Sequence, residues 1–129
     1  MIRKAKVCLV YCTPFGIVYE HIGIASIGAY IKERGYDVKL ICLEESPDAV
    51  HTITEIAPDI VGFNTVTSNL EKMLDLAFKL KSQMPVFTVL GRIGVSGNPV
   101  DIMKNYEEID AIVLGEGEIT FYELIERVT

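Results

Sequence analysis

The chain has 129 residues, of which 50% are hydrophobic and 23% are charged, and its formal net charge at pH 7 is -6. This length supports one compact core and is too short for two, so we predict a single domain over residues 1–129. No apolar run is long enough to cross a bilayer, and interspersed charges with an acidic balance disfavour a basic footprint for nucleic acid. We therefore expect neither a membrane nor a nucleic acid as partner.

Apolar, β-rich runs alternate with segments of helical period along the whole chain. The predicted strands are 6–12, 38–43, 60–66, 86–90 and 111–114. Each is nearly continuously apolar, as strands buried on both faces of a parallel sheet are. The pattern predicts an α/β fold, namely a flavodoxin-like three-layer sandwich with a five-stranded parallel sheet of order 2-1-3-4-5.

The helices between these strands have recognisable ends. Gly35 closes the first helix, Ser46-Pro47 and Asn98-Pro99 each supply a cap with a first-turn proline, and Ser68 with Glu71 forms a capping box. The third helix places one apolar stripe toward the core, which consists of Leu70, Met73, Leu74, Ala77 and Leu80. Its charged residues are expected to face water, and these are Glu71, Lys72, Asp75, Lys79 and Lys81.

Right-handed crossovers bring all the strand-to-helix loops to one edge of the sheet, where open α/β folds bind ligands. The first loop, 13–21, is long for such a connection, which favours a ligand-binding role. The helix after it carries small residues, namely Gly23, Ala25, Ser26, Gly28 and Ala29. They are compatible with tight packing on the sheet and equally with a slot for an inserted ligand group.

Three further loops have unusual compositions. Short polar side chains run over 64–68, beyond what one helix cap needs, and 91–97 holds three glycines whose spacing matches neither a dinucleotide fingerprint nor a phosphate loop. The turn 115–118 alternates two glycines with two acids at a helix start. Each is either a ligand-binding element or ordinary turn and cap chemistry.

No catalytic or metal-binding constellation emerges from the sequence. Neither His21 nor His51 belongs to an acid-base pair, and we expect both at the surface. Cys8 and Cys12 lie four apart on one face of a strand, and together with Cys42 they are predicted to be structural. The chain start carries no apolar export signal, so the cytoplasm is the expected location.

Three segments carry a family resemblance: Ile24 to Val38, Pro58 to Phe63, and Asp110 to Glu118 followed by Thr120-Phe121. The chain as a whole resembles the cobalamin-binding domain found at the amino terminus of many radical S-adenosylmethionine enzymes, and these three segments carry the resemblance. The resemblance implies the fold predicted above, with the corrin ring over the carboxyl edge of the sheet and its nucleotide tail among the loops.

The resemblance implies a set of cofactor-binding residues in four loops. They are Thr13, Pro14, Phe15 and Gly16; Asn64, Thr65, Val66 and Thr67; Gly91, Arg92 and Gly94; and Gly115, Glu116 and Gly117. The family's cobalt-ligating histidine after the first strand has no counterpart here, so histidine-ligated cobalt is not expected. The three-cysteine motif that holds an iron-sulfur cluster is also missing. The resemblance therefore implies that the cluster and S-adenosylmethionine belong to a following catalytic domain or a separate partner, within a larger methyltransferase, cyclase or related radical enzyme.

Other functions of the same fold remain open at this stage. A degenerate interaction or scaffold module that no longer binds cobalamin is the main alternative, because Arg92 stands where relatives carry a second glycine. A signalling receiver would need an aspartate where the third strand ends in Asn64-Thr65, and a flavin-binding electron carrier would need a serine- and threonine-rich loop in place of 13–16. Both are disfavoured.

Overall fold

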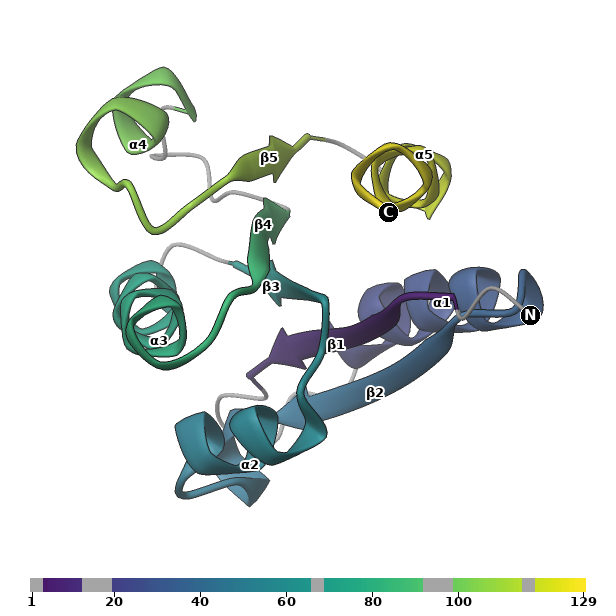
Figure 1. Cartoon of the computed structure of the whole chain (residues 1–129), viewed down its shortest axis with the longest axis horizontal. Helices are drawn as coiled ribbons and strands as arrows, with labels where there is room; N and C mark the ends of the chain where they lie inside the picture. The colour runs from purple at the N-terminus through teal and green to yellow at the C-terminus, as the bar shows by residue number, and fades with distance from the viewer. Residues whose placement is uncertain (1–3, 13–19, 66–68, 92–98, 115–117) are drawn as a thin grey trace.

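The fold was taken from a computed structural model that describes residues 4–12, 20–65, 69–91, 99–114 and 118–129. In chain order its elements are β1 (Lys6–Tyr11), α1 (Glu20–Glu33), β2 (Asp37–Cys42), the 3₁₀ turn η2 (Leu43–Glu45), α2 (Ala49–Ile56), β3 (Ile60–Asn64), α3 (Leu70–Gln83), β4 (Phe87–Gly91), α4 (Pro99–Asn105), β5 (Ala111–Val113) and α5 (Glu118–Val128). The strands form one parallel sheet of order β2-β1-β3-β4-β5, which confirms the predicted topology (Figure 1).

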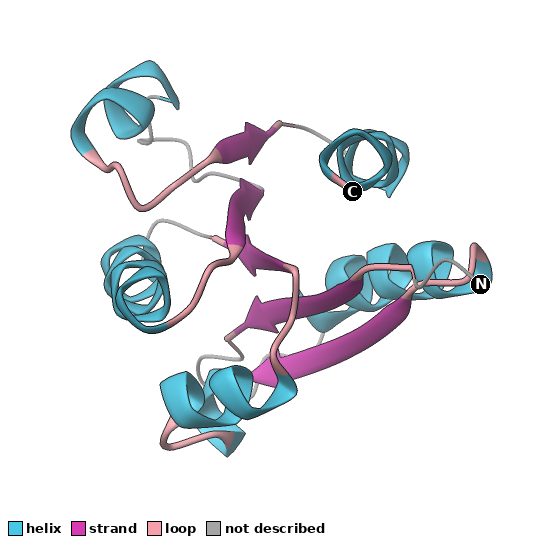
Figure 2. Cartoon of the chain, viewed as in Figure 1, coloured by secondary structure: helices cyan, strands magenta, loops and turns pink. Residues whose placement is uncertain are grey.

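Helices cover both faces of the sheet. Figure 1 shows α2, α3 and α4 on one side of it and α1 and α5 on the other, and Figure 2 shows the same three layers by secondary structure. Each face has its own hydrophobic core, because successive residues of a strand point to opposite faces. Val10 and Phe63 belong to the α2–α4 core, whereas Leu9 and Ile60 belong to the α1/α5 core.

Helix ends follow the predicted residues in part. Gly35 has a positive φ of 94°, the left-handed conformation expected of a glycine just after a helix, and Pro99 is the first residue of α4. The prediction of Ser46 as the cap of the second helix is wrong. Asp48 is the cap, and its carboxylate accepts a hydrogen bond of 3.2 Å from the His51 backbone N–H.

The apolar stripe of α3 is confirmed, with Met73, Leu74, Ala77 and Leu80 buried, and Leu76 adds to it. Lys81 differs from its prediction as a water-facing residue. Its side chain is only 29% exposed and forms an ion pair with Asp110, which also accepts a 2.9 Å hydrogen bond from the Thr88 backbone N–H. This contact joins α3 to the strands at the amino end of the sheet.

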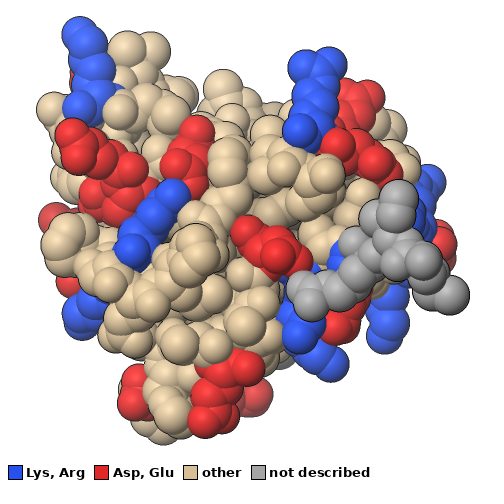
Figure 3. All heavy atoms as spheres, in the orientation of Figure 1, with Lys and Arg blue, Asp and Glu red and all other residues tan. Residues whose placement is uncertain are grey.

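The surface carries charges of both signs. On the face drawn in Figure 3, acidic and basic side chains lie interspersed among uncharged residues. No helix among the described residues has the length and hydrophobicity needed to span a membrane.

Candidate functional site

An apolar slot lies between α1 and α5 at the carboxyl end of the central strands. Its cavity volume is about 50 Å³, and the unoccupied space within its lining is about 410 Å³ when open solvent is included. Its lining consists of Leu9, Ile24, Ile27, Gly62, Phe63, Asn64, Val89, Gly91, Val113 and Phe121. The slot therefore combines a floor from β1, β3, β4 and β5 with walls from two helices.

The floor follows from the period of the strands. Gly62 and Asn64 are two apart on β3, as are Val89 and Gly91 on β4, so all four face the α1/α5 side. Register pairs Gly62 with Val89 and Asn64 with Gly91 across the two strands. The two glycines thus leave the middle of the floor without side chains.

Gly62 and Gly91 differ in the space around them. A Cβ on Gly62 would lie 2.9 Å from Leu9 Cδ2 and 3.1 Å from Phe121 Cε2 and Cζ, which is closer than van der Waals contact. A Cβ on Gly91 would meet only the Phe63 carbonyl oxygen, at 3.9 Å. Gly62 therefore permits the close packing at the base of the slot, whereas Gly91 borders open space.

Thr65 fixes the position of Gly91. Its backbone N–H and its hydroxyl both donate to the Gly91 carbonyl, at 2.9 and 2.8 Å, and the residue is fully buried. The adjacent Asn64 is half-buried on the slot side, and its carbonyl accepts a 3.4 Å hydrogen bond from Asn69 Nδ2. Asn64 therefore lines the slot itself, whereas Thr65 only holds the Gly91 backbone that lines it.

The sequence left two roles open for the small residues of α1, namely tight packing on the sheet and a slot for a ligand. At Gly28 the structure supports tight packing. A Cβ there would lie 3.3 Å from Leu40 Cδ2 and 3.6 Å from Leu9 Cδ1 and Val38 Cγ1, so the helix rests closely on β1 and β2. The other small residues whose burial is described, Ala25, Ser26 and Ala29, are exposed. The wall of the slot is made by Ile24 and Ile27, which the sequence did not single out.

The cysteines lie within the two cores. Cys8 and Cys12 share the α2–α4 face, as predicted, and Cys42 lies on the other. Burial raises the pKa of the Cys8 thiol to about 12, and burial followed by the nearby Glu44 carboxylate raises the pKa of Cys12. Among the residues that the structure describes, no three His, Cys, Asp or Glu side chains are grouped to hold a metal ion.

The remaining predicted residues are distributed as follows. Eleven of the proposed cofactor contacts lie outside the described residues: Thr13, Pro14, Phe15, Gly16, Val66, Thr67, Arg92, Gly94, Gly115, Glu116 and Gly117. His51 is exposed, as expected, and its Nε2 lies 3.1 Å from Glu55 Oε1. The structure therefore brings Asn64, Thr65 and Gly91 together at one end of the slot.

Known proteins resemble this chain in sequence. It is 34% identical over 113 residues to an uncharacterized methyltransferase of Pyrococcus horikoshii, covering 84% of this chain and 24% of the relative. It is 33% identical over 113 residues to the anaerobic magnesium-protoporphyrin IX monomethyl ester cyclase of Rubrivivax gelatinosus, covering 81% of this chain and 20% of that protein. The chain thus spans a quarter or less of each relative.

A solved structure and a family model agree with these matches. The cobalamin-dependent S-adenosylmethionine radical enzyme OxsB superposes with a TM-score of 0.76 at 19% identity, covering 97% of this chain and 19% of OxsB, which supports the fold. The family model described as B12 binding domain matches residues 9–125. Since this match covers nearly the whole chain, from within β1 to within α5, the chain belongs to the B12-binding domain family.

Proposed function

We propose that the carboxyl edge of the sheet holds cobalamin, with its nucleotide tail in the slot between α1 and α5. The observation that carries the proposal is the slot itself, an apolar opening with a glycine floor at the edge where open α/β sheets bind ligands. The family to which the chain belongs supplies the identity of the ligand.

The slot fits the chemistry of that tail. Its walls are the aliphatic Ile24 and Ile27 and the ring of Phe121, and such surfaces suit the flat aromatic base of a nucleotide. Among the described residues of the lining, Asn64 has the polar side chain, and its amide can both donate and accept. Gly91 lets a ligand approach the backbone closely, because its missing side chain leaves open space.

The corrin ring is proposed to lie over the same edge. In this arrangement the loop from Thr13 to Gly16 would lie beneath the ring, Asn64, Val66 and Thr67 would contact ring amides or the tail, and the loops beginning at Gly91 and Gly115 would flank the tail. Thr65 is buried and would contribute by holding Gly91. When bound, cobalamin supplies a cobalt centre able to carry a methyl group or exchange electrons. The contribution of this chain is to bind the cofactor, orient it and cover part of it from water.

The domain is proposed to serve a larger radical S-adenosylmethionine enzyme. The relatives are four to five times longer than the segment they share with this chain, which supports a catalytic partner beyond these residues. Methyl transfer and ring cyclisation are the reactions that the relatives' names give, and we propose a reaction of that class here. The iron-sulfur cluster and S-adenosylmethionine would bind in that catalytic part.

The test is a titration with hydroxocobalamin, followed by gel filtration and a visible spectrum of the protein peak. We expect corrinoid to co-elute with the parent chain. Gly91→Leu should abolish co-elution without lowering the melting temperature, because the new side chain extends from a position with open space on the slot side. Ala29→Leu places the same leucine side chain on the exposed face of α1 and should bind normally.

Two outcomes would contradict the proposal at different levels. A parent chain that elutes without corrinoid would remove cobalamin binding. If Gly91→Leu binds corrinoid with parental affinity, cobalamin binding is still supported, but the nucleotide tail does not lie in the slot.

A further inference from the structure

The floor of the slot has two rows of residues, which the register of the parallel strands defines. The inner row crosses β1, β3 and β4 and consists of Leu9, Gly62 and Val89. The outer row lies two residues nearer the carboxyl edge, crosses β3, β4 and β5, and consists of Asn64, Gly91 and Val113. A group that enters the slot from the carboxyl edge therefore passes the outer row before it reaches the inner one.

Hydrocarbon side chains surround the inner row. Leu9 and Val89 are each 1% exposed, and both belong to the core beneath α1 and α5. Ile24 and Phe121 line the slot from these two helices and are each 5% exposed. A ring that enters between these side chains therefore exchanges contact with water for contact with carbon atoms.

The carbonyl groups of the outer row already have donors. The Gly91 carbonyl accepts hydrogen bonds from both the N–H and the hydroxyl of Thr65, and the Asn64 carbonyl accepts one from Asn69 Nδ2. The polar side chain of the described lining, that of Asn64, carries one amide oxygen and one amide nitrogen. The described lining therefore offers an amide in its outer row and hydrocarbon further in.

Corrinoids differ in the ring that ends their nucleotide tail. Cobalamin ends in dimethylbenzimidazole, whose methyl groups and fused benzene ring are apolar, whereas other corrinoids end in a purine such as adenine or in p-cresol linked through its oxygen. Adenine carries an exocyclic amine and several ring nitrogens, which exceed what one amide can pair. Burial of a polar group without a partner costs free energy, whereas burial of apolar ring surface gains it.

We propose that the slot selects corrinoids by this ring, binding a methylbenzimidazole or a cresol and discriminating against a purine. The inference rests on the proposed function for the class of ligand, and it adds which tails are rejected and which residues reject them. Leu9, Val89 and the apolar walls determine the specificity, because they give a purine no partners. Asn64 can pair with the ring nitrogen that a benzimidazole has free when it is released from cobalt.

The test measures the Kd of the parent chain for hydroxocobalamin and for corrinoids whose tails end in p-cresol or adenine. A cresol cannot coordinate cobalt and adenine does so weakly, so the comparison of these two separates the ring from the cost of releasing it from the metal. We expect the Kd of the adenine corrinoid to be at least about tenfold that of the cresol corrinoid, because one polar group left buried without a partner has an effect of that size.

Val89→Thr tests whether the floor is the source of this preference. The substitution places a hydroxyl on the inner row, which gives adenine a partner and leaves a polar group unpaired beside a cresol. The ratio of the adenine Kd to the cresol Kd should fall about threefold to tenfold relative to the parent. Val113→Thr, on the outer row, is the second variant should Val89→Thr fail to fold.

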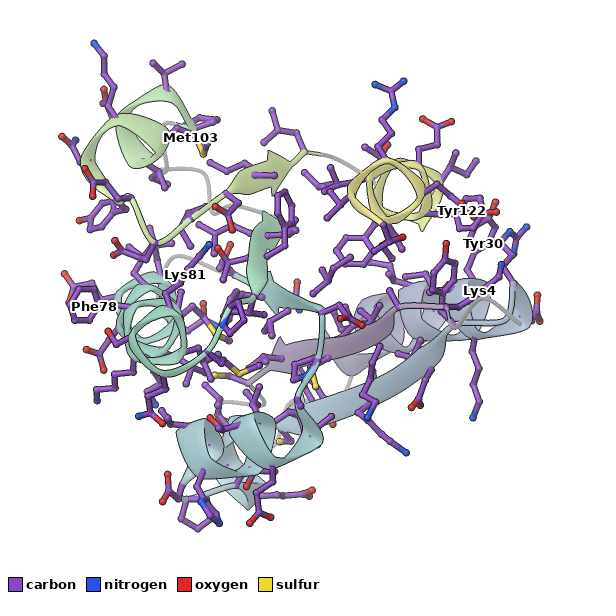
Figure 4. All side chains as sticks on the ribbon, in the orientation of Figure 1. Lys4, Tyr30, Phe78, Lys81, Met103 and Tyr122 are labelled. Carbon is purple, nitrogen blue, oxygen red and sulfur yellow. The ribbon has the colours of Figure 1, made fainter. Side chains whose placement is uncertain are left out.

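Val61→Thr is the matched control. It makes the same change at a fully buried position of β3 on the other face of the sheet, the side on which Figure 4 labels Phe78 of α3 and Met103 of α4. A loss of folded protein changes both Kd values by the same factor, so the ratio should stay parental in this variant. A ratio that falls equally in Val61→Thr and Val89→Thr would overturn the proposal.

Two other results separate the selection from the proposed function. Equal Kd values of the parent for the cresol and adenine corrinoids, or a parental ratio in Val89→Thr, would overturn the selection and leave cobalamin binding supported. A parent chain that binds none of these corrinoids would overturn cobalamin binding and the selection together.

Discussion

Replacing Gly62 with alanine tests how tightly the base of the slot is packed. The added Cβ would lie 2.9 Å from Leu9 Cδ2 and 3.1 Å from two ring carbons of Phe121. Leu9 is 1% exposed and Phe121 is 5% exposed, so both are packed side chains that can yield to the new carbon only by moving into the slot that they line. We therefore expect Gly62→Ala to destabilise the ligand-free protein.

The size of the effect follows from two opposing terms. Forcing one extra carbon into a packed core costs about 1–3 kcal/mol. Replacing glycine by alanine stabilises by about 0.4–1 kcal/mol, because the unfolded chain loses freedom. The net loss is then about 1 kcal/mol, which lowers the melting temperature of a domain of this length by about 3–5 °C.

Gly91→Ala is the matched control, since it makes the same chemical change where the nearest atom is 3.9 Å away. We expect it to be neutral or to stabilise by up to about 1 kcal/mol. Urea unfolding of both variants, followed by circular dichroism, measures the difference. If Gly62→Ala proves as stable as Gly91→Ala, the close packing of Leu9 and Phe121 against β3 is not as described.

Three further predictions concern single groups. Because burial raises the pKa of Cys8 to about 12, iodoacetamide should label it at pH 8 only in urea; stoichiometric labelling of the native protein, measured by mass spectrometry, would contradict its burial. Thr65→Val should lower the free energy of unfolding by about 0.5–1.5 kcal/mol, measured in urea, because the Gly91 carbonyl loses one of its two donors. An unchanged midpoint would show that this hydroxyl contributes nothing. The Tyr122 and Tyr36 hydroxyls lower the folded-state pKa of Glu126, so its stabilisation is complete above the unfolded pKa and is lost as pH falls through the folded value. The melting temperatures of the parent and Glu126→Gln should therefore converge as the pH falls below the ordinary carboxyl range, and a constant gap would count against this effect of the tyrosine hydroxyls.

The sheet could be predicted from the sequence because its strands are buried on both faces. Five apolar runs separated by helical segments leave few topologies for a parallel sheet, and the predicted order is the observed one. The first residue of the helix near 46–49 was harder to predict, because Ser46 and Asp48 are both good N-caps and the sequence does not rank them. The prediction that Lys81 faces water failed because its partner Asp110 is 29 residues away, and the helical period of α3 cannot identify so distant a partner.

The lining of the slot could be predicted where it depends on loop composition and not where it depends on packing. Asn64 and Gly91 were singled out because short polar side chains over 64–68 exceed what one helix cap needs and because three glycines lie within 91–97, and both residues line the slot. Ile24, Ile27 and Phe121 look like ordinary core residues, and only the placement of the two helices makes them walls. Gly62 carried a usable signal, since a glycine inside a buried strand marks a close approach.

The position of the slot is a consequence of the topology. Neighbouring strands lie about 4.8 Å apart, so five strands span about 19 Å between the outer two. Packed helices are about 8–10 Å apart, so three of them match this width and two leave part of it uncovered. The chain turns back once, at β1, which places α2, α3 and α4 on one face and leaves only α1 and α5 for the other.

The uncovered part lies where α1 and α5 cannot both reach. Gly28 fixes α1 over β1 and β2, and Phe121 fixes α5 against Gly62 on β3. The floor left between the helices at the carboxyl edge is formed by the ends of β3 and β4, where Gly91 carries no side chain to fill it. A flat apolar group of a ligand can therefore pack against the part of the sheet that a third helix would otherwise cover.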